Sequence, residues 1–296
     1  MSEKCQTCPS TSCSAKEKRP GENDQAYELR QRLRARMCLV RHKILVLSGK
    51  GGVGKSTVAV NIAAALQRAG KRVGLLDTDM HGPSIPRLMG LEGHEAEVKD
   101  GAVVPLEAEG GIKVMSLGFL LGREPDTAVI WRGPVKVGLI RQFLADVNWG
   151  ELDYLVVDLP PGTGDEPITL VQSLEDADGA VVVTTPQEVA ISDVRRSLRF
   201  CKKVGLKVLG LIENMSRFVC PHCGERADIF RSGGGKRLAQ NAGVPFLGAI
   251  PLEPEITLAS DIGRPYVNLD KDSAAARAYE EIVRPILALD NREEAA

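Results

Sequence analysis

The sequence of 296 residues predicts an α/β protein with a doubly wound, mostly parallel sheet and helices on both faces. Two observations support this fold class. Short runs of Val, Ile and Leu, which suit strands buried on both faces, alternate along the chain with segments of helical length. In addition, a glycine-rich loop follows the first such strand and precedes the first helix, at residues 49–57. Alternating strands and helices of this kind join parallel strands through crossovers, as doubly wound folds require.

The expected elements follow one another in a regular order. The strand at 44–47 reads Ile-Leu-Val-Leu, and the helix at 55–69 begins directly after the glycine-rich loop. The strand at 154–158 reads Tyr-Leu-Val-Val-Asp and ends on a carboxylate. The other strands are expected at the remaining short apolar runs, 72–76, 112–116, 180–184, 208–212 and 246–250. The other helices are expected between them, at 135–146, 166–174, 189–203, 234–242 and 274–289.

The chain is expected to divide into three parts. Residues 1–40 form a polar leader with cysteines and too little apolar material to bury a core alone. Residues 41–290 form the α/β domain, and residues 291–296 form an acidic tail. Basic residues gather just before the first strand, and we interpret them as a solvated linker or helix face rather than a nucleic-acid contact. They are Arg30, Arg32, Arg34, Arg36, Arg41 and Lys43.

Composition excludes several classes of function. Lys and Arg total 38 against 39 Asp and Glu, so the net charge of −1 provides no global positive field for nucleic acid. No apolar run approaches membrane-spanning length, and the first residues contain no apolar segment that would serve as a signal peptide. We therefore expect a cytoplasmic protein with neither a membrane nor a nucleic acid as its partner.

Residues 49–57 fit the phosphate-loop pattern G-x-x-x-x-G-K-[ST]. The glycines allow backbone N–H groups to surround a phosphate, and the following helix turns its positive end toward the anion. Lys55 is expected to reach the β- and γ-phosphates, and the Ser56 hydroxyl is expected to bind Mg2+. The loop residues expected to contact the nucleotide are Gly49, Lys50, Gly51, Gly52, Val53, Gly54, Lys55, Ser56 and Thr57.

Carboxylates end two of the expected strands. Asp158 follows the apolar strand at 154–158, and this Walker B form predicts that it coordinates Mg2+ directly or through water. Asp77 ends the strand at 72–76, which places it near the outer shell of the metal; strand-end capping is the alternative for Asp77 and Asp79. Gly162, in the loop after Asp158, is expected to offer its backbone N–H to the γ-phosphate.

Several motifs resemble those of a known group of ATPases. Lys50, placed directly after the first glycine, resembles the signature lysine of the deviant P-loop ATPases, which include the MinD/ParA group and the nitrogenase iron protein. The runs at 77–86, 131–134, 158–165 and 213–216 resemble D-x-D-x-x-G-P-S-x-P, W-R-G-P, D-x-P-P-G-T-G-D and E-N-M-S of the Mrp/ApbC/Nbp-type iron–sulfur carrier ATPases. These matches extend over nearly the whole chain after the leader.

The resemblance implies a nucleotide-sandwich homodimer in which Lys50 contacts the nucleotide of the partner subunit. It also implies that Asp79 positions or polarises the attacking water, which is a catalytic role alongside Lys50 and Lys55. Asn214 and Pro251 occupy the positions that frame the adenine in the family. The preference for ATP over GTP rests on the resemblance alone.

The segment Cys220-Pro221-His222-Cys223 has spacing that chelates one metal centre through two thiolates. Four thiolates complete a zinc site or a [4Fe–4S] cluster, so two more ligands must come from elsewhere, and a two-fold dimer supplies them symmetrically. The resemblance implies that Cys220 and Cys223 of both subunits bridge a labile [4Fe–4S] cluster. Zinc and a redox dithiol are the alternatives from the spacing, and His222 is an alternative ligand.

The leader contains Cys5, Cys8 and Cys13, which resemble the N-terminal cysteine motif of cytosolic scaffold members but lack one upstream cysteine. We expect them to hold a second iron–sulfur cluster or zinc, with a tail of incidental thiols as the alternative. Taken with these motifs, the resemblance implies an ATPase that uses ATP and Mg2+ to carry a [4Fe–4S] cluster and transfer it to apo iron–sulfur client proteins. The alternatives are a MinD/ParA-type positioning ATPase and a zinc-structured regulatory ATPase.

Overall fold

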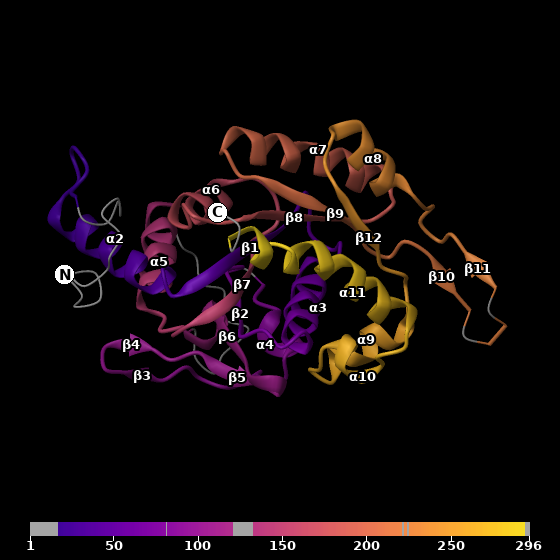
Figure 1. Cartoon of the computed structure of the whole chain (residues 1–296), viewed down its shortest axis with the longest axis horizontal. Coiled ribbons are helices and arrows are strands. Elements are labelled where there is room, and N and C mark those ends of the chain that lie inside the picture. Colours follow the sequence, from indigo (N-terminus) through magenta and orange to yellow (C-terminus); the bar gives the residue numbers. More distant parts are fainter. Residues whose placement is uncertain (1–16, 81, 121–132, 221, 224, 294–296) are drawn as a thin grey trace.

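The computed structural model describes residues 17–293, except for residues 81, 121–132, 221 and 224 (Figure 1). Its centre is an eight-stranded sheet in the order β12-β9-β8-β1-β7-β2-β6-β5. Neighbouring strands run parallel, apart from the edge pair of β5 and β6, which is antiparallel. The strands are β1 (Val40–Ser48), β2 (Val73–Asp77), β5 (Leu106–Ala108), β6 (Ile112–Ser116), β7 (Leu152–Asp158), β8 (Gly179–Thr184), β9 (Val208–Glu213) and β12 (Phe246–Ala249).

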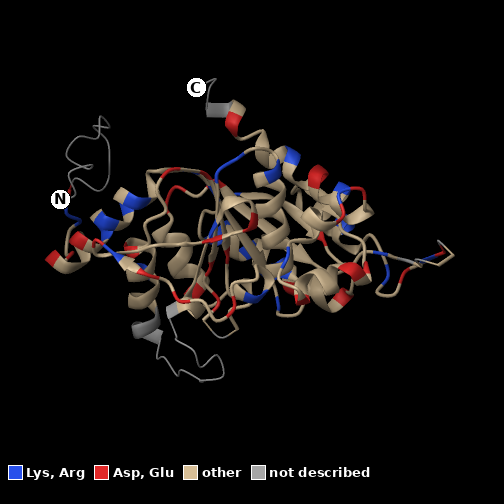
Figure 2. Ribbon diagram, turned by 90° about the horizontal axis from the view of Figure 1, so that it is seen from below, with Lys and Arg blue, Asp and Glu red and all other residues tan. Residues whose placement is uncertain are grey.

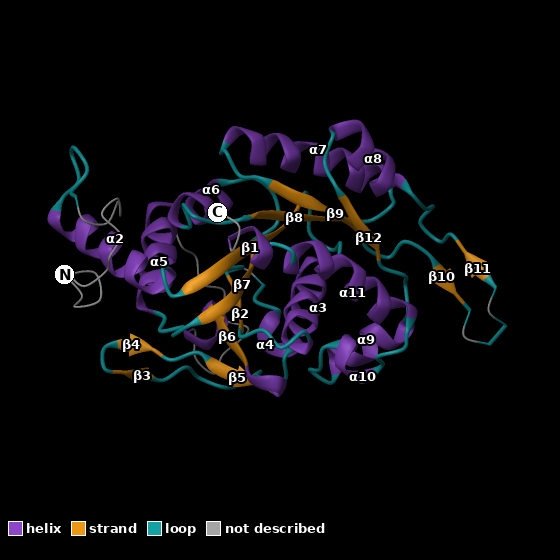
Figure 3. Cartoon of the chain, viewed as in Figure 1, coloured by secondary structure: helices purple, strands orange, loops and turns teal. Residues whose placement is uncertain are grey.

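Helices cover both faces of this sheet (Figure 3). On one face α3 (Lys55–Arg68) packs against α11 (Ala274–Leu287), and three short helices lie beside them: α4 (Ile85–Leu88), α9 (Pro254–Asp261) and α10 (Tyr266–Leu269). After β6 the chain reverses its direction across the sheet, through β7, β8, β9 and β12. Because the connections between parallel strands are right-handed, the helices that connect these strands lie on the other face. These are α5 (Gly133–Asp146), α6 (Asp165–Ser173), α7 (Glu188–Lys203) and α8 (Gly234–Ala242). The doubly wound fold predicted from the sequence is therefore confirmed.

All of the expected strands and helices are present, and the structure adds elements that the pattern did not predict. The most substantial is α2 (Asp24–Met37), a helix within the predicted leader. The side chain of Asn23 caps its first turn, and Leu33 and Met37 are buried where the helix packs against α5. The smaller additions include the edge strand β5, the short helices α4, α9 and α10, and α12 (Asp290–Glu293). Two hairpins are also new: β3 (Val98–Lys99) with β4 (Ala102–Val103), and β10 (Phe218–Val219) with β11 (Arg226–Ala227).

The central strands form the core. Ile44, Leu45, Val46 and Leu47 of β1 have no exposed surface, because β7 and β8 flank the strand and helices cover it from both faces. Near the N-terminal end of β1, the ring centroid of His42 lies 5.0 Å from the ring centroid of Tyr154 on β7. Among the described residues, no helix is both long and apolar enough to cross a membrane.

Candidate nucleotide site and cysteine hairpin

The phosphate loop connects β1 to α3 at the carboxyl edge of the sheet, beside the point where strand order reverses. Two of its glycines have no room for a side chain. Gly54 has φ +77°, and a Cβ there would lie 2.3 Å from the Asn214 side-chain nitrogen. A Cβ on Gly49 would lie 2.5 Å from the backbone carbon of Asp193. No side chain caps the first turn of α3, so its amide groups are available to an anion, which fits a bound phosphate.

Lys55, Ser56 and Asp158 lie together at the start of α3 and the end of β7. The Lys55 ammonium is 2.6 Å from Asp158 Oδ1, and the Ser56 hydroxyl donates to Asp158 Oδ2 at 2.6 Å. Asp158 is fully buried and Lys55 nearly so. Burial raises the pKa of Asp158, whereas the Lys55 ammonium and the Ser56 hydroxyl lower it. A serine hydroxyl and a carboxylate in contact form a donor set that suits Mg2+.

Asp77 stands opposite Asp158 on the neighbouring strand β2. Its carboxylate accepts hydrogen bonds from the Asp79 and Ile85 N–H groups at 3.0 and 3.2 Å and from the Ser116 hydroxyl at 3.2 Å. Complete burial and the nearby charge of Asp158 raise the pKa of Asp77 to about 7. Asp79 is half-buried at the end of the same turn. The structure thus brings together the three carboxylates that the sequence singled out.

The other predicted nucleotide contacts also lie around the loop. The Gly162 N–H donates to the Ser48 carbonyl at 3.1 Å, which holds the loop after β7 against the end of β1. The Asn214 side-chain amide donates to the Val53 carbonyl at 2.9 Å. Pro251 lies beside the same segment, because Ser216 N–H donates to the Ile250 carbonyl at 2.9 Å. The predicted contact of the Gly162 N–H with the γ-phosphate is not formed here, because that N–H donates to Ser48, and it remains a prediction for the nucleotide-bound state. The role of Asn214 and Pro251 at the adenine also remains a prediction.

Sequence analysis missed a role for Glu213. This carboxylate is buried at the end of β9, and its two oxygens accept hydrogen bonds from the N–H groups of Gly233 and Gly235 at 3.0 and 2.6 Å. It therefore fixes the first turn of α8, which follows the cysteine-bearing segment. The signal was a carboxylate at the end of an apolar strand with a run of glycines about twenty residues later.

Cys220 and Cys223 lie beyond β10, in the hairpin that extends away from the body of the molecule in both views (Figures 1 and 2). Cys223 is exposed and Cys220 half-buried. Hydrogen bonds from the backbone of Cys223 and His222 lower the pKa of the Cys220 thiol, which favours the thiolate that binds metals. Within the described residues, no group of three or more His, Cys, Asp or Glu side chains is arranged to hold a metal ion. Cys5, Cys8 and Cys13 lie outside the described residues.

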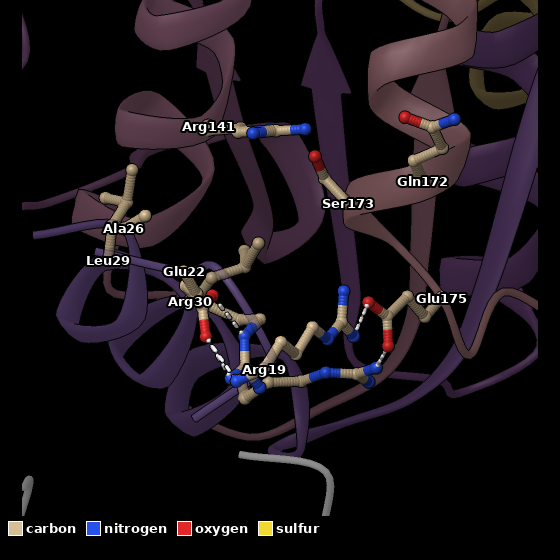
Figure 4. Close-up of a pocket in the computed structure, with 11 residues that line it drawn as sticks. Arg19, Glu22, Ala26, Leu29, Arg30, Arg141, Gln172, Ser173 and Glu175 are labelled. Carbon is tan, nitrogen blue, oxygen red and sulfur yellow. Dashed lines mark hydrogen bonds and ion pairs between the residues drawn. The ribbon is translucent and has the colours of Figure 1, made fainter. Parts of the chain in front are cut away.

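The end of the leader is fastened to the domain by ion pairs around a cavity of about 130 Å3 (Figure 4). The Arg19 guanidinium lies 2.6 Å from Glu175, and Arg34 contacts the same carboxylate. Arg30 pairs with Glu22 at 2.7 Å in the same wall. Since Glu175 follows α6, these contacts connect the segment before α2 to the helix that begins after the Gly162 loop.

The parallel sheet, the phosphate loop and the carboxylates at its edge define a P-loop NTPase. Solved structures of MinD cell-division ATPases share the fold. That of Pyrococcus furiosus superposes with a TM-score of 0.62 at 22% identity, covering 84% of this chain and 99% of the other. A nucleotide-binding protein from Archaeoglobus fulgidus, solved in complex with ADP, gives a TM-score of 0.71 at 42% identity, covering 80% of this chain and 92% of that one.

The family model of the NUBPL iron-transfer P-loop NTPases, within the ParA group, matches residues 39–287 of this chain. The chain therefore belongs to this family. It is 50% identical over 287 residues to the iron-sulfur cluster carrier protein of Methanocaldococcus jannaschii, covering 96% of this chain and 95% of the relative. It is 54% identical over 253 residues to the cytosolic Fe-S cluster assembly factor NUBP2 of Bos taurus, covering 84% and 93%. The resemblance to iron–sulfur carrier ATPases is confirmed.

Proposed function

We propose that the chain is an ATP-dependent iron–sulfur cluster carrier that binds a [4Fe–4S] cluster between two subunits and transfers it to apo-proteins. The observation that carries the proposal is the location of Cys220 and Cys223. They stand in a projecting hairpin of the same chain that holds the phosphate loop, and this hairpin supplies only two of the four thiolates that a cluster needs. The names of the relatives from Methanocaldococcus jannaschii and Bos taurus agree with this role and with a cytosolic location.

Hydrolysis would depend on the residues at the sheet edge. Lys55 would bind the β- and γ-phosphates. Ser56 and Asp158 would hold Mg2+, with Asp77 behind them, and the metal would supply positive charge against the phosphates. To do so, Lys55 leaves Asp158 for the phosphates. Asp79 orients the attacking water, and Lys50 reaches the nucleotide of the partner subunit. Phosphoryl transfer requires mainly positioning and charge stabilisation, so these few groups suffice.

A short segment connects the two sites. Asn214 bonds to the phosphate loop through Val53, and six residues later the chain reaches Cys220. Arg217 lies between them in the sequence. Its carbonyl accepts a hydrogen bond from the Leu252 N–H at 2.8 Å, and its side chain pairs with Asp228, which follows β11 at the base of the hairpin. A shift of the loop on nucleotide binding or hydrolysis would therefore move the base of the cysteine hairpin. This movement would change the spacing of the two hairpins in a dimer and with it the hold on the cluster.

The test uses anaerobic reconstitution with iron and sulfide, for the wild type and for Cys220→Ala/Cys223→Ala. The proposal predicts broad absorption near roughly 400 nm, where thiolate–iron charge transfer falls, and its loss in the double variant apart from any part due to the leader cysteines. Recovery of zinc without an iron-dependent band would contradict the proposal and favour a zinc-structured ATPase.

A second arm separates binding from transfer. Lys55→Ala is expected to keep the reconstituted cluster and to lose ATP-dependent transfer to an apo-ferredoxin. Equal transfer by this variant would refute the coupling of hydrolysis to delivery, while the absorption experiment would still stand on its own.

A further inference from the structure

Helices α7 and α8 lie next to each other near the sheet edge formed by β9 and β12 (Figure 1). Residues of both helices and of the segments that follow them line a cleft, and none of these residues belongs to the phosphate loop. Its volume is about 580 Å3, within the roughly 300–1,000 Å3 range of pockets that hold ligands. Side chains from the end of α7, the end of α8 and the strand between them line it. The larger apolar members are Leu198, Leu206, Val208, Leu238, Val244 and Pro245.

The floor of the cleft belongs to a small apolar cluster that is separate from the main core. Leu238 is buried within this cluster, whereas Leu198, Val208 and Val244 are packed against it and remain partly exposed. The α8 helix ends beside the cleft at Gly243, whose φ of +65° turns the chain toward Val244. A partly exposed apolar floor of this kind is suited to an apolar side chain of another molecule.

One rim of the cleft is basic. Arg195, Arg199 and Lys202 line it from α7, and all three are exposed. Their spacing of four and three residues places them on one side of the helix, over a length of about 10 Å. No acidic residue lines the cleft, and within the described residues none of the three cations has a carboxylate partner. The neighbouring Arg196, by contrast, pairs with Asp193.

The ordinary structural roles of basic residues do not account for this rim. Lys202 and Lys203 in the last turn of α7 complement the negative end of the helix, but Arg195 lies two turns earlier. Like charges at these spacings repel one another and weaken the helix, so the row is unfavourable unless an anion lies against it. A single carboxylate, such as that of a fatty acid, would meet only one of the three cations. Several carboxylates along one chain would meet the whole row.

We propose that the cleft between α7 and α8 binds an acidic, amphipathic peptide segment of another protein. Its carboxylates pair with Arg195, Arg199 and Lys202, and its apolar side chains enter the cleft beside Leu198 and Val244. The carboxylates face the flank of α7 and avoid the carbonyl-rich end of α8, where an anion is disfavoured. The surface is distinct from the nucleotide loop and from the cysteine hairpin, so the inference does not depend on the proposed carrier function.

The test selects peptides from a displayed library of random 12-residue sequences on the wild-type chain. Arg195→Glu/Arg199→Glu/Lys202→Glu is the counter-target. The matched control, Lys203→Glu/Lys207→Glu/Lys236→Glu, makes the same charge change at exposed lysines that do not line the cleft. The enriched sequences are expected to combine Asp or Glu with large apolar residues. Synthesised and labelled, they should bind the counter-target at least about tenfold more weakly than the wild type or the control, and more weakly in high salt.

Two further arms keep the result decisive. Arg195→Gln/Arg199→Gln/Lys202→Gln removes the charges without reversing them, and Leu198→Ala tests the apolar half; both should weaken the peptide and leave ATP hydrolysis unchanged. Enrichment of sequences without acidic residues, or equal binding to the counter-target, would overturn the proposal. Tight binding of a labelled single-stranded DNA that is lost in the counter-target would also overturn it, because the row would then serve nucleic acid.

Discussion

Replacing Lys55 with Met is expected to destabilise the chain in a pH-dependent way when neither nucleotide nor Mg2+ is present. The Lys55 ammonium lies 2.6 Å from Asp158, and the carboxylate is fully buried. Removing one partner of such a pair leaves a buried charge without compensation, which costs about 3–5 kcal/mol in typical proteins. The Ser56 hydroxyl still donates to Asp158 in the variant, so we expect the lower part of that range.

Protonation sets a limit on this cost. In the variant, the buried Asp158 can lose its charge by taking up a proton. An aspartate in the unfolded chain has a pKa of about 3.9, and protonation costs about 1.4 kcal/mol for each pH unit above that value. The limit is therefore about 4 kcal/mol at pH 7 and about 1.5 kcal/mol at pH 5. Lys55 lowers the pKa values of both Asp158 and Asp77, so its loss raises both. A carboxyl group whose folded pKa is raised loses its stabilising contribution as pH rises through that pKa, so the deficit of the variant grows from pH 5 to pH 7.

The assay is urea unfolding followed by circular dichroism at pH 5, 6 and 7 with a chelator present. Lys55→Met/Asp158→Asn is expected to recover all but about 1 kcal/mol of the loss, because it removes the buried charge as well. Lys50→Met, which changes a half-buried lysine of the same loop, should stay within about 0.5 kcal/mol of the wild type. A Lys55→Met deficit that is independent of pH, or one that Asp158→Asn fails to relieve, would refute the reasoning.

Three further predictions follow from single contacts. Gly54→Ala should cost about 1–3 kcal/mol and weaken nucleotide binding, because of its φ of +77° and the close Asn214 nitrogen; thermal melts with and without ADP measure this, and unchanged melting would contradict it. Glu213→Gln should cost about 1–3 kcal/mol and increase amide exchange at the start of α8, since one oxygen that accepts from Gly233 or Gly235 becomes a donor. Glu175→Ala should cost about 1 kcal/mol or less and speed proteolysis near Arg19, whereas Glu151→Ala at the exposed pair with Arg72 should do neither.

The strands could be predicted from the sequence because burial on both faces selects continuous apolar runs. Residues 44–47 and 154–158 report that burial directly, and their places in the centre of the sheet explain why the pattern is so clear. The helix α2 was not predicted, because it has no continuous apolar pattern of this kind. Arginines alternate with other residues in its second half, and its only buried apolar residues are Leu33, Ala35 and Met37, so its hydrophobic stripe is too narrow to recognise from periodicity.

In the candidate site, too, some features could be predicted from the sequence and others could not. Motifs named the loop residues and the carboxylates, and parallel strands place their carboxyl ends together, which accounts for the proximity of Asp77 and Asp158. Long-range contacts could not be predicted in this way. Glu213 meets Gly233 and Gly235 across the whole cysteine-bearing segment, and Arg19 meets Glu175 over more than half of the chain. Spacing in the sequence contains no information about such pairs until the fold is known.

The Lys55–Asp158 pair also bears on how nucleotide binding would drive the proposed carrier. Lys55 and Mg2+ both carry positive charge and would repel each other at Asp158, so we expect Lys55 to move from the carboxylate to the phosphates when ATP and Mg2+ bind together. Separating Lys55 from Asp158 costs free energy. That cost is offset only when the phosphates compensate the charge of Lys55 and Mg2+ compensates the charge of Asp158. Mg2+ alone would meet a carboxylate already neutralised by Lys55. For this reason we expect Mg2+ to bind weakly without nucleotide and the rearrangement of the loop, with the Asn214 segment bonded to it, to depend on both.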